Sequence, residues 1–387
     1  LDDKTKLTFE YNYQRANMSN VGSFYVFTPD GYAKLPRDFT SIPEGLPGTK
    51  MNDHSFYATL NREINKDWKF TAQFSRFDFN QVGSSAWPDK VNADYTMIRG
   101  IGIWDAKSKM TMGQAFVNGD LHTGSVRHRV LAGLDAAHKD YMADWGQAHA
   151  LDTAGGEFDM LNPHLGVPNN GYPRFDRETP LAERATAAGG TMGQQYSSVY
   201  VQDELGFLDN KIRLTLAGRY TQLSMWAWGA AADKADHFTP RAGLSVSIDK
   251  STSVYALYDQ AFLAQSGVMK AGGVPKPITG NNMEIGIKRE WLDGRWASSL
   301  TAYRIIKRNE LVAGPMDPDT HVAYSIDLGE KRAQGIEFDL KGTLARGLNL
   351  VANYAFTESV VTKINEGAET DLKVGQYLPA YATHTAN

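Results

Sequence analysis

Residues 212–220 read Ile-Arg-Leu-Thr-Leu-Ala-Gly-Arg-Tyr. Apolar side chains stand at every second position, as at Leu214 and Leu216, and Arg213 stands between them. Successive side chains of a β-strand point to opposite faces, whereas a helix repeats every 3.6 residues. The stretch therefore predicts a β-strand with one apolar face and one charged face.

The same period of two recurs along the chain. Four further stretches show it, and they cover residues 6–14, 283–288, 336–341 and 348–356. Strands of this kind approach the length of about 10 residues that a tilted strand needs to cross a membrane. On the apolar face we expect Phe9, Tyr11, Leu214, Leu216, Phe338 and Leu350. On the opposite face we expect the charged residues Glu10, Arg213, Arg219, Glu284, Lys288, Glu337, Asp339 and Lys341.

Composition excludes several classes of protein. The 387 residues include 40 Lys and Arg, 44 Asp and Glu, and no cysteine. Without cysteine there is no disulfide, no zinc–thiolate site, no Cys-ligated iron–sulfur cluster and no cysteine nucleophile. The near-neutral balance gives no basic field for nucleic acid. The mean hydropathy is −0.41, and no apolar run approaches the roughly 18 residues of a membrane helix. A β-barrel stays compatible, because its lumen accepts the polar half of each strand.

The connections between the predicted strands alternate in length. Short, turn-like connections are expected at residues 65–67, 123–125, 208–210, 249–251, 292–294 and 345–347. Long connections are expected at about residues 19–53, 80–95, 140–192, 226–237, 260–281, 307–322 and 358–378. An up-and-down meander with short turns at one end and long loops at the other is typical of outer-membrane barrels.

This alternation also fixes the strand count. Residues 97–123 must form one long strand, broken near residues 105–107 at its outer end. If they formed two strands, every later short turn would lie at the opposite end of the meander from the earlier short turns. The count is then about thirteen strands, with another beginning at Leu378. We therefore predict an all-β fold, a partial antiparallel up-and-down transmembrane β-barrel. With no linker and with ends that look cut, residues 1–387 are expected to be an incomplete barrel domain.

Several ordered motifs resemble one family. They are His-Arg-Val-Leu-Ala-Gly-Leu-Asp at 128–135, Phe-Asp-Met-Leu-Asn-Pro at 158–163, Ser-Ser-Val-Tyr-Val-Gln-Asp-Glu at 197–204, Pro-Arg-Ala-Gly-Leu at 240–244 and Gly-Glu-Lys-Arg-Ala-Gln-Gly-Ile-Glu-Phe at 329–338. Together they resemble the barrel of TonB-dependent siderophore receptors, most closely the ferrichrome, coprogen and pyoverdine branch.

The resemblance implies a 22-stranded barrel with an N-terminal plug in the outer membrane of a Gram-negative bacterium. About 13–14 of those strands would lie in this chain, while the plug and the terminal strands would lie outside it. The implied cargo is a ferric siderophore, taken up with energy from the TonB complex through an N-terminal segment that the chain lacks. Iron arrives already chelated, so the resemblance implies no cofactor, no protein metal ligand and no catalytic residue. The charges on the polar face would contact the plug or stand in lumen water.

Several histidines and acidic side chains are compatible with other functions. His122, His128, His138 and His149 lie within 28 positions, but without the tight spacing of H-x-x-x-H or H-E-x-x-H. Isolated polar histidines are the simpler interpretation, and a weak loop metal site is the alternative. A barrel enzyme would use partners such as His128 and Asp203 with a serine, yet no G-x-S-x-G signature appears.

Two other readings concern transport. A TonB-dependent receptor for cobalamin, haem or oligosaccharide is the nearest alternative to a siderophore receptor. A passive porin is a further one, against which the strand number and the family motifs count.

Cargo recognition is expected from aromatic rings and hydrogen-bond donors at the strand tops and in the long loops. Parity continued from the strand at 130–136 places Tyr141 and Trp145 on the lumenal side, so this pair is the first choice. Tyr172 and Arg174, in the longest loop, follow, because Arg or Tyr there can hydrogen-bond chelate oxygens.

Two further pairs complete the candidate set. Trp226 and Trp228 share one face at the start of a loop. Parity with Tyr220 places them in the aromatic girdle at the lipid interface, while a bulge would turn them toward cargo. Phe262 and Gln265 are the last loop candidates.

Overall fold

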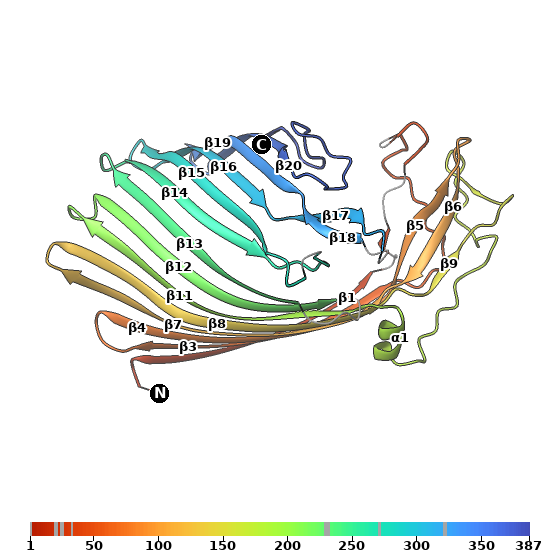
Figure 1. The fold of residues 1–387 in the computed structure, drawn as a ribbon, viewed down its shortest axis with the longest axis horizontal. Coiled ribbons are helices and arrows are strands. Elements are labelled where there is room, and N and C mark those ends of the chain that lie inside the picture. Colours follow the sequence, from red (N-terminus) through yellow and green to blue (C-terminus); the bar gives the residue numbers. More distant parts are fainter. Residues whose placement is uncertain are drawn as a thin grey trace.

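A computed structural model describes residues 2–18, 22–23, 27–31, 34–227, 233–269, 272–319 and 323–387. In this part of the chain, fourteen strands form one continuous antiparallel sheet that curls around an open space (Figure 1). In spatial order the strands are β1 (Thr5–Met18), β3 (Thr49–Glu63), β4 (Trp68–Val82), β7 (Asp105–Thr123), β8 (Val126–Asp144), β11 (Thr191–Phe207), β12 (Ile212–Ala227), β13 (Asp233–Ser247), β14 (Thr252–Leu263), β15 (Ile278–Trp291), β16 (Trp296–Arg308), β19 (Gly329–Ala345), β20 (Leu348–Ile364) and β21 (His384–Ala386). β1 and β21 are the two edges of the sheet.

The remaining elements are short and lie at the end of the sheet with the long connections. A smaller sheet contains β2 (Gly22–Ser23), β5 (Ser84–Val91), β6 (Thr96–Ile103), β9 (Ala148–Ala150) and β10 (Phe158–Asp159). A separate hairpin is formed by β17 (Leu311–Met316) and β18 (Ala323–Asp327), and the helix α1 covers Leu181–Ala187. Among the described residues, no helix is long and apolar enough to cross a membrane.

The register confirms the two faces predicted from the sequence. Ala115, Leu134, Val199, Tyr220 and Phe238 are paired in one row across five strands, and directly paired residues share a face. The same pairing puts all six predicted apolar-face residues on this face and all eight predicted charges on the other.

Exposure shows which face is convex. Val199 on the apolar face is 59% exposed, whereas its neighbour Ser198 on the polar face is 5% exposed. Side chains converge on the inside of a curved sheet and spread apart on the outside. The polar face therefore lines the open space, and the apolar face is the outer surface.

The predicted short turns are also confirmed, but the connection expected to be long at residues 226–237 covers only residues 228–232, because β12 and β13 extend further than expected. The six short turns join the strand pairs β3–β4, β7–β8, β11–β12, β13–β14, β15–β16 and β19–β20. The predicted long strand at 97–123 is divided at Trp104, where β6 leaves the main sheet and β7 continues in it. Thirteen long strands precede β21, which begins at His384 and not at Leu378.

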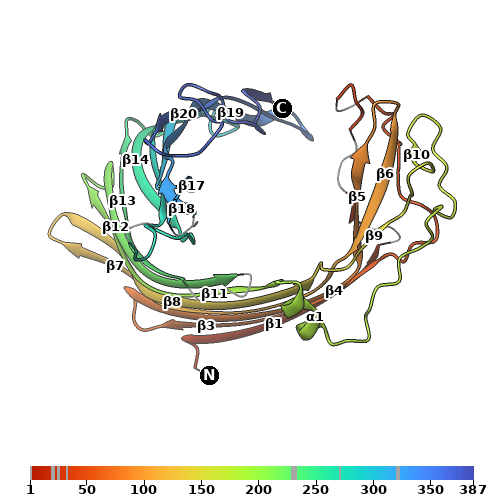
Figure 2. The ribbon, with the colours of Figure 1, turned by 45° about the vertical axis from the view of Figure 1, so that its right-hand side comes forward.

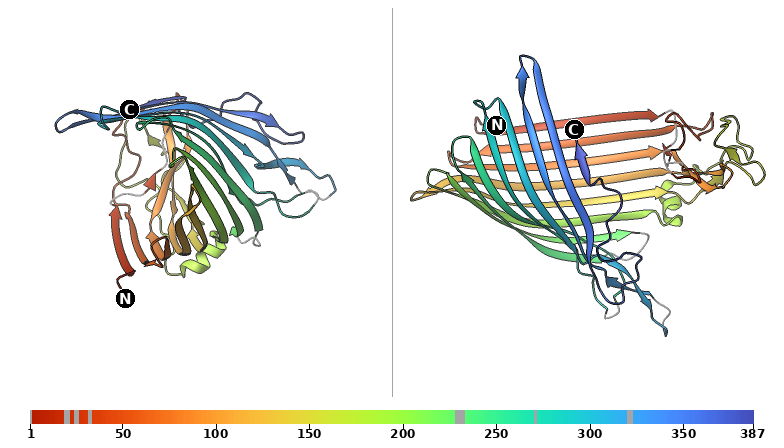
Figure 3. Two further views of the ribbon diagram at one scale, coloured as in Figure 1. Left: turned by 90° about the vertical axis from the view of Figure 1, so that its left-hand side faces the viewer. Right: turned by 90° about the horizontal axis from the view of Figure 1, so that it is seen from above.

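Pro240 marks a change in the pairing of the sheet. β13 pairs with β14 only from Arg241–Asp259 toward the short turn, so its outer part has no β14 partner. Proline has no N–H to donate and is confined to places where a ladder ends. Beyond that point His237 Nε2 and Gln260 Oε1 lie 2.9 Å apart and bridge the two strands. From above, β15, β16, β19 and β20 run at a steep angle to β1, β3, β4 and β7 (Figure 3).

Candidate functional site

The long connections at one side of the opening fold into a compact body with its own core. We call residues 34–48, 84–103 and 145–190 the first loop module. Its buried side chains form two clusters, one around Ala86, Ile101 and Leu151 and one around Met97, Phe158 and Met160. Partly buried residues of the other segments, among them Ile42, Leu46 and Phe39, pack against these clusters. Loops that bury an apolar core of their own present a fixed surface.

A buried ion pair holds this module together. Arg99 in β6 and Asp152 after β9 are about 95% buried, with Arg99 NH2 and Asp152 Oδ1 2.7 Å apart. Arg99 Nε also donates to Asp152 Oδ2 at 2.8 Å, and NH1 donates to the carbonyl of Ser41. The Arg99 guanidinium lies 4.2 Å from the centre of the Phe158 ring. One arginine thus joins all three segments of the module.

A second network of charges ties the module to the rim of the sheet. Asp105 at the start of β7 and Asp144 at the end of β8 are register partners, and both are buried. Arg184 of α1 bridges them, with NH1 2.5 Å from Asp144 Oδ2 and NH2 3.2 Å from Asp105 Oδ2. Arg177 adds a contact of 3.1 Å to Asp105 and donates to the carbonyl of Gly83 at 2.8 Å. Burial alone lowers the pKa of Arg184, but the hydrogen bonds with Asp144 and Asp105 outweigh burial and raise it.

Of the first-choice candidates, Tyr141 lies on the polar face. It is half-buried in β8, and its hydroxyl accepts a hydrogen bond of 3.3 Å from Trp104 Nε1. Trp145 follows the end of β8 as the first residue of the third segment of the first loop module and is 37% exposed. Trp104, which is 40% exposed, was missed by the sequence reasoning. Its signal was an aromatic residue directly before the acidic residue at the predicted strand break.

Tyr172 and Arg174 lie on the first loop module, away from β8. The hydroxyl of Tyr172 donates to the carbonyl of Glu44 at 2.6 Å and so joins two segments of the module. Arg174 is exposed, and its guanidinium has no partner among the described residues. Arg174 is therefore available to a ligand, whereas the Tyr172 hydroxyl is already occupied.

Trp226 lies on the apolar face, as parity predicted. It pairs with Gly193, and its ring is 5.8 Å from that of His138 on the same face. Above the apolar rows of this face the side chains become polar, as at Gln222 and Ser224, so Trp226 stands at the outer border. Trp228 lies outside the described residues.

Phe262 and Gln265 belong to the opposite side of the opening. We call residues 264–269, 272–277, 309–319, 323–328 and 365–377 the second loop module. The Gln265 amide donates to the carbonyls of Lys276 (2.7 Å) and Asn309 and accepts from the Leu311 N–H, so it joins three segments of this module. Phe262 lies at the end of β14, 5.1 Å from the His237 ring.

The two modules face each other. Figure 2 shows β17 and β18 on one side of the space enclosed by the sheet and β5 and β6 on the other.

In the second module Glu310 binds Lys331 at 2.7 Å and Lys307 at 3.2 Å. Burial raises the pKa of Glu310, but the hydrogen bonds from Lys331 and Lys307 outweigh burial and lower it.

Below the rim, the polar face carries a charged and aromatic cluster. Arg219 makes two hydrogen bonds of 2.8 Å to the carboxylate of Asp135, which also accepts one from Ser198. The Arg219 guanidinium lies 5.9 and 5.7 Å from the ring centres of Tyr196 and Tyr200. Bidentate pairing and two ring contacts hold the guanidinium in one place.

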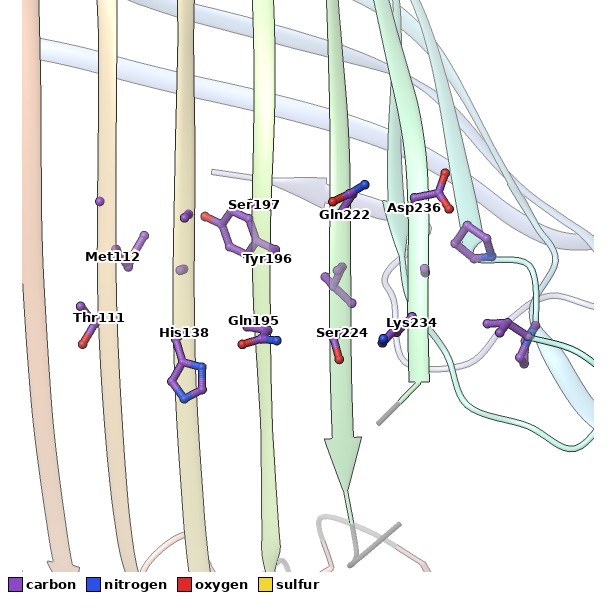
Figure 4. Close-up of a pocket in the computed structure, with 18 of the residues that line it drawn as sticks. Thr111, Met112, His138, Gln195, Tyr196, Ser197, Gln222, Ser224, Lys234 and Asp236 are labelled. Atoms are coloured by element: carbon purple, nitrogen blue, oxygen red, sulfur yellow. The ribbon is translucent and has the colours of Figure 1, made fainter. Parts of the chain in front are cut away.

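A hollow of about 1110 Å³ lies against the outer ends of five strands (Figure 4). The central lining residue of each strand belongs to one row of the polar face, namely Met112, Ala137, Tyr196, Leu223 and Ala235. Val274, Pro275 and Pro277 of the second loop module also line it. The hollow thus joins the sheet wall to a loop module, and none of the seven candidate residues in the described part of the chain lines it.

The acid and histidine pairs give no catalytic or metal centre in the described part of the chain. His128 Nδ1 and Asp203 Oδ2 lie 2.7 Å apart on the apolar face. Their register partners are Leu121, Leu205, Val130 and Leu216, so no serine stands next to either in the sheet. No group of three or more His, Asp or Glu side chains placed to hold a metal ion occurs in the same residues.

Comparison with known proteins agrees with this architecture. The ferrichrome outer membrane transporter/phage receptor of Escherichia coli K12 is 32% identical over 398 residues, which cover 93% of this chain and 50% of that protein. The metal-pseudopaline receptor CntO of Pseudomonas aeruginosa UCBPP-PA14 is 28% identical over 326 residues, or 81% of this chain and 43% of the relative. The chain spans about half the length of the curated relatives it matches.

Solved structures share the fold. The siderophore receptor PiuA from Acinetobacter baumannii superposes with a TM-score of 0.74 at 18% identity, over 100% of this chain and 59% of that chain. A family model described as TonB dependent receptor-like, beta-barrel, matches residues 1–387. Members of that family are transporters and receptors and not enzymes. This chain belongs to the TonB-dependent receptor β-barrel family.

Proposed function

We propose that the parent protein is a receptor and transporter in the outer membrane of a Gram-negative bacterium. It takes up ferric siderophore with energy from the TonB complex. The observation that carries the proposal is the two-faced sheet with loop modules at one end only. An apolar convex face suits outer-membrane lipid, a polar concave face suits a lumen, and loop modules at one mouth suit capture of a ligand from outside.

Residues 1–387 would be one part of a larger barrel domain. Both β1 and β21 leave an unpaired edge, and an unpaired edge in hydrocarbon leaves backbone groups without partners. Further strands would close the wall, and a plug would fill the lumen. Polar-face charges such as Arg219 and Glu10 would stand in lumen water or contact the plug.

Cargo would bind between the two loop modules. We assign direct contact to Tyr141, Trp145 and Arg174, which combine rings, a hydroxyl and an unpaired cation near the opening. Tyr172 and Gln265 would shape the surface through their contacts inside the modules, and Phe262 through its contact with His237.

Trp226 and Trp228 would belong to the aromatic girdle at the lipid border. This assignment rests on the position of Trp226 on the apolar face, beside His138.

In this scheme the protein does not have to coordinate the iron itself. The siderophore oxygens fill the coordination sphere of the iron, so the receptor needs neither a cofactor nor metal ligands of its own. Its side chains have to recognise the outer surface of the chelate. Nothing is covalently changed, and no catalytic group is required.

Uptake by cells tests the proposal. The full-length parent is expressed in a strain without its own siderophore receptors. A panel of ferric siderophores labelled with radioactive iron is supplied, with radiolabelled cobalamin, haem and oligosaccharide as control cargoes. We expect uptake of at least one ferric siderophore that disappears when TonB is deleted or the proton gradient is dissipated. Uptake of cobalamin, haem or oligosaccharide in place of every siderophore would assign another cargo. Uptake that persists without TonB would favour a passive pore.

A further inference from the structure

At the rim of the sheet, Trp104 and Tyr141 form an aromatic pair, and hydrogen bonds fix the backbone of Trp104. The Trp104 N–H donates to the carbonyl of Gly83 at 3.0 Å, and the Trp104 carbonyl accepts from Gln81 Nε2 at 3.1 Å. Both backbone groups of Trp104 are thereby fixed, while the indole is 40% exposed. Its Nε1 donates to the Tyr141 hydroxyl at 3.3 Å. A fixed backbone with an exposed ring is what a preorganised contact surface needs.

Two buried carboxylates face each other beside the aromatic pair, one at the start of β7 and one at the end of β8. Asp105 directly follows Trp104, and Asp144 stands three residues after Tyr141. The two carboxylates are register partners at 3% and 2% exposure. Like charges placed directly opposite each other destabilise a strand pair, and burial increases the effect. The pairing of β7 and β8 up to the aromatic residues therefore depends on a cation between them.

Arg184 supplies that cation from a distant part of the chain. Its guanidinium reaches Asp105 at 3.2 Å and Asp144 at 2.5 Å, and only 9% of its side chain is exposed. A planar guanidinium can bridge two carboxylates at once, whereas a lysine ammonium acts as a single point charge. Arg177 contacts Asp105 but is 34% exposed and does not reach Asp144. Arg184 is thus the residue that links the two strand ends.

We propose that Trp104 and Tyr141 form an aromatic platform that contacts the iron chelate, and that Arg184 is the positioning residue of this platform. The inference rests on the proposed function and adds to it a contact residue, Trp104, and a residue that acts without touching cargo. The platform offers ring faces together with a hydroxyl. It suits a chelate that presents apolar surface and hydrogen-bonding oxygens side by side.

A double-mutant cycle in the full-length receptor tests the inference. The variants are Trp104→Ala, Arg184→Lys and the double substitution, and the probes are ferrichrome and ferrioxamine B. We expect Trp104→Ala to weaken binding by about tenfold or more, as aromatic contact residues do. Arg184→Lys keeps a positive charge and should weaken binding several-fold. In the double variant the combined loss should be clearly smaller than the product of the two single losses, because Arg184 acts in part through Trp104.

Glu183→Gln is the matched control. Glu183 is the exposed neighbour of Arg184 in α1, and its substitution should leave affinity unchanged. Independent losses that multiply in the double variant would overturn the positioning role, as would an unchanged affinity in Arg184→Lys. An unchanged affinity in Trp104→Ala would overturn the platform. A wild-type receptor that binds neither these probes nor any other ferric siderophore of the uptake panel would count against the proposed function itself and is thus distinguishable from these outcomes.

Discussion

A charge introduced in the middle of the apolar face should weaken the barrel, and Leu216→Arg is the sharpest case. Along β12 the outward positions are apolar or glycine from Ile212 to Tyr220 and become polar at Gln222. Leu216 stands at the centre of this stretch and is 49% exposed. The substitution therefore removes little packing and places a guanidinium on the lipid side of the sheet, next to the carboxylate of its register partner Asp203.

The geometry of the strand gives the magnitude. A rise of about 3.3 Å per residue at a tilt of about 45° gives about 2.3 Å of height per residue. Leu216 then lies close to the midplane of an apolar band about 25 Å tall, and Leu214 lies about 5 Å nearer the short turn. Arginine costs about 2–4 kcal/mol at the midplane and about 0–1 kcal/mol near the interface. The carboxylate of Asp203 can pair with a guanidinium at position 216, so we expect a cost near the lower end of the midplane range, about 2 kcal/mol. Leu214 lies nearer the interface, but its register partners Leu205 and Leu244 offer no charge.

Thr215→Arg is the matched control. Thr215 is the next residue but points to the polar face, where its register partners are Glu204 and Gly243. An added arginine there finds an opposite charge and free space, so the cost should stay below about 1 kcal/mol. The assay is denaturant unfolding of the full-length receptor from lipid vesicles, followed by tryptophan fluorescence. Equal costs for Leu216→Arg and Thr215→Arg would refute the assignment of the two faces.

Three further predictions concern the interior. Asp152→Ala leaves the buried charge of Arg99 unpaired and should destabilise the first loop module by about 3–5 kcal/mol. The measurement is the loss of amide-hydrogen protection in β5 and β6, and unchanged protection would contradict the role of the pair. Arg219→Ala should lower the free energy of unfolding by about 1–3 kcal/mol, a value between those of surface and buried ion pairs, because Asp135 is partly exposed. Adding Asp135→Asn to the Arg219→Ala variant should cause no further loss in unfolding measurements. Since the pKa of Glu310 is lowered in the folded state, its contribution is present above its ordinary pKa of 4.5 and is lost as pH falls below that value. Protection of β17 should therefore decrease as pH falls below 4.5 in wild type but not in Glu310→Gln.

The regular part of the fold was predictable because strand periodicity is local. Alternation around Leu214 and Leu216 gave the two faces, and the spacing of the short turns gave the strand count and the broken strand at Trp104. These features depend on residues a few positions apart, so one sequence contains them.

The loop modules were not predictable for the opposite reason. The bridge from Asp105 and Asp144 to Arg184 joins residues 79 and 40 positions apart, and α1 has seven residues without a periodic pattern. Tyr141 was placed on the correct face because it lies in a regular strand. The contact of Tyr172 with Glu44 spans 128 positions, which no local pattern can show.

The most direct test of the account is equilibrium binding of ferric siderophores to the purified full-length receptor in detergent. Quenching of tryptophan fluorescence by the iron chelate gives the affinity, and the same siderophore without iron is the control. We predict saturable binding of one chelate per receptor at sub-micromolar concentration for at least one ferric siderophore, weakened by Trp104→Ala and Tyr141→Ala. A folded receptor that binds none of the panel, or whose binding is unchanged by both substitutions, would contradict the account.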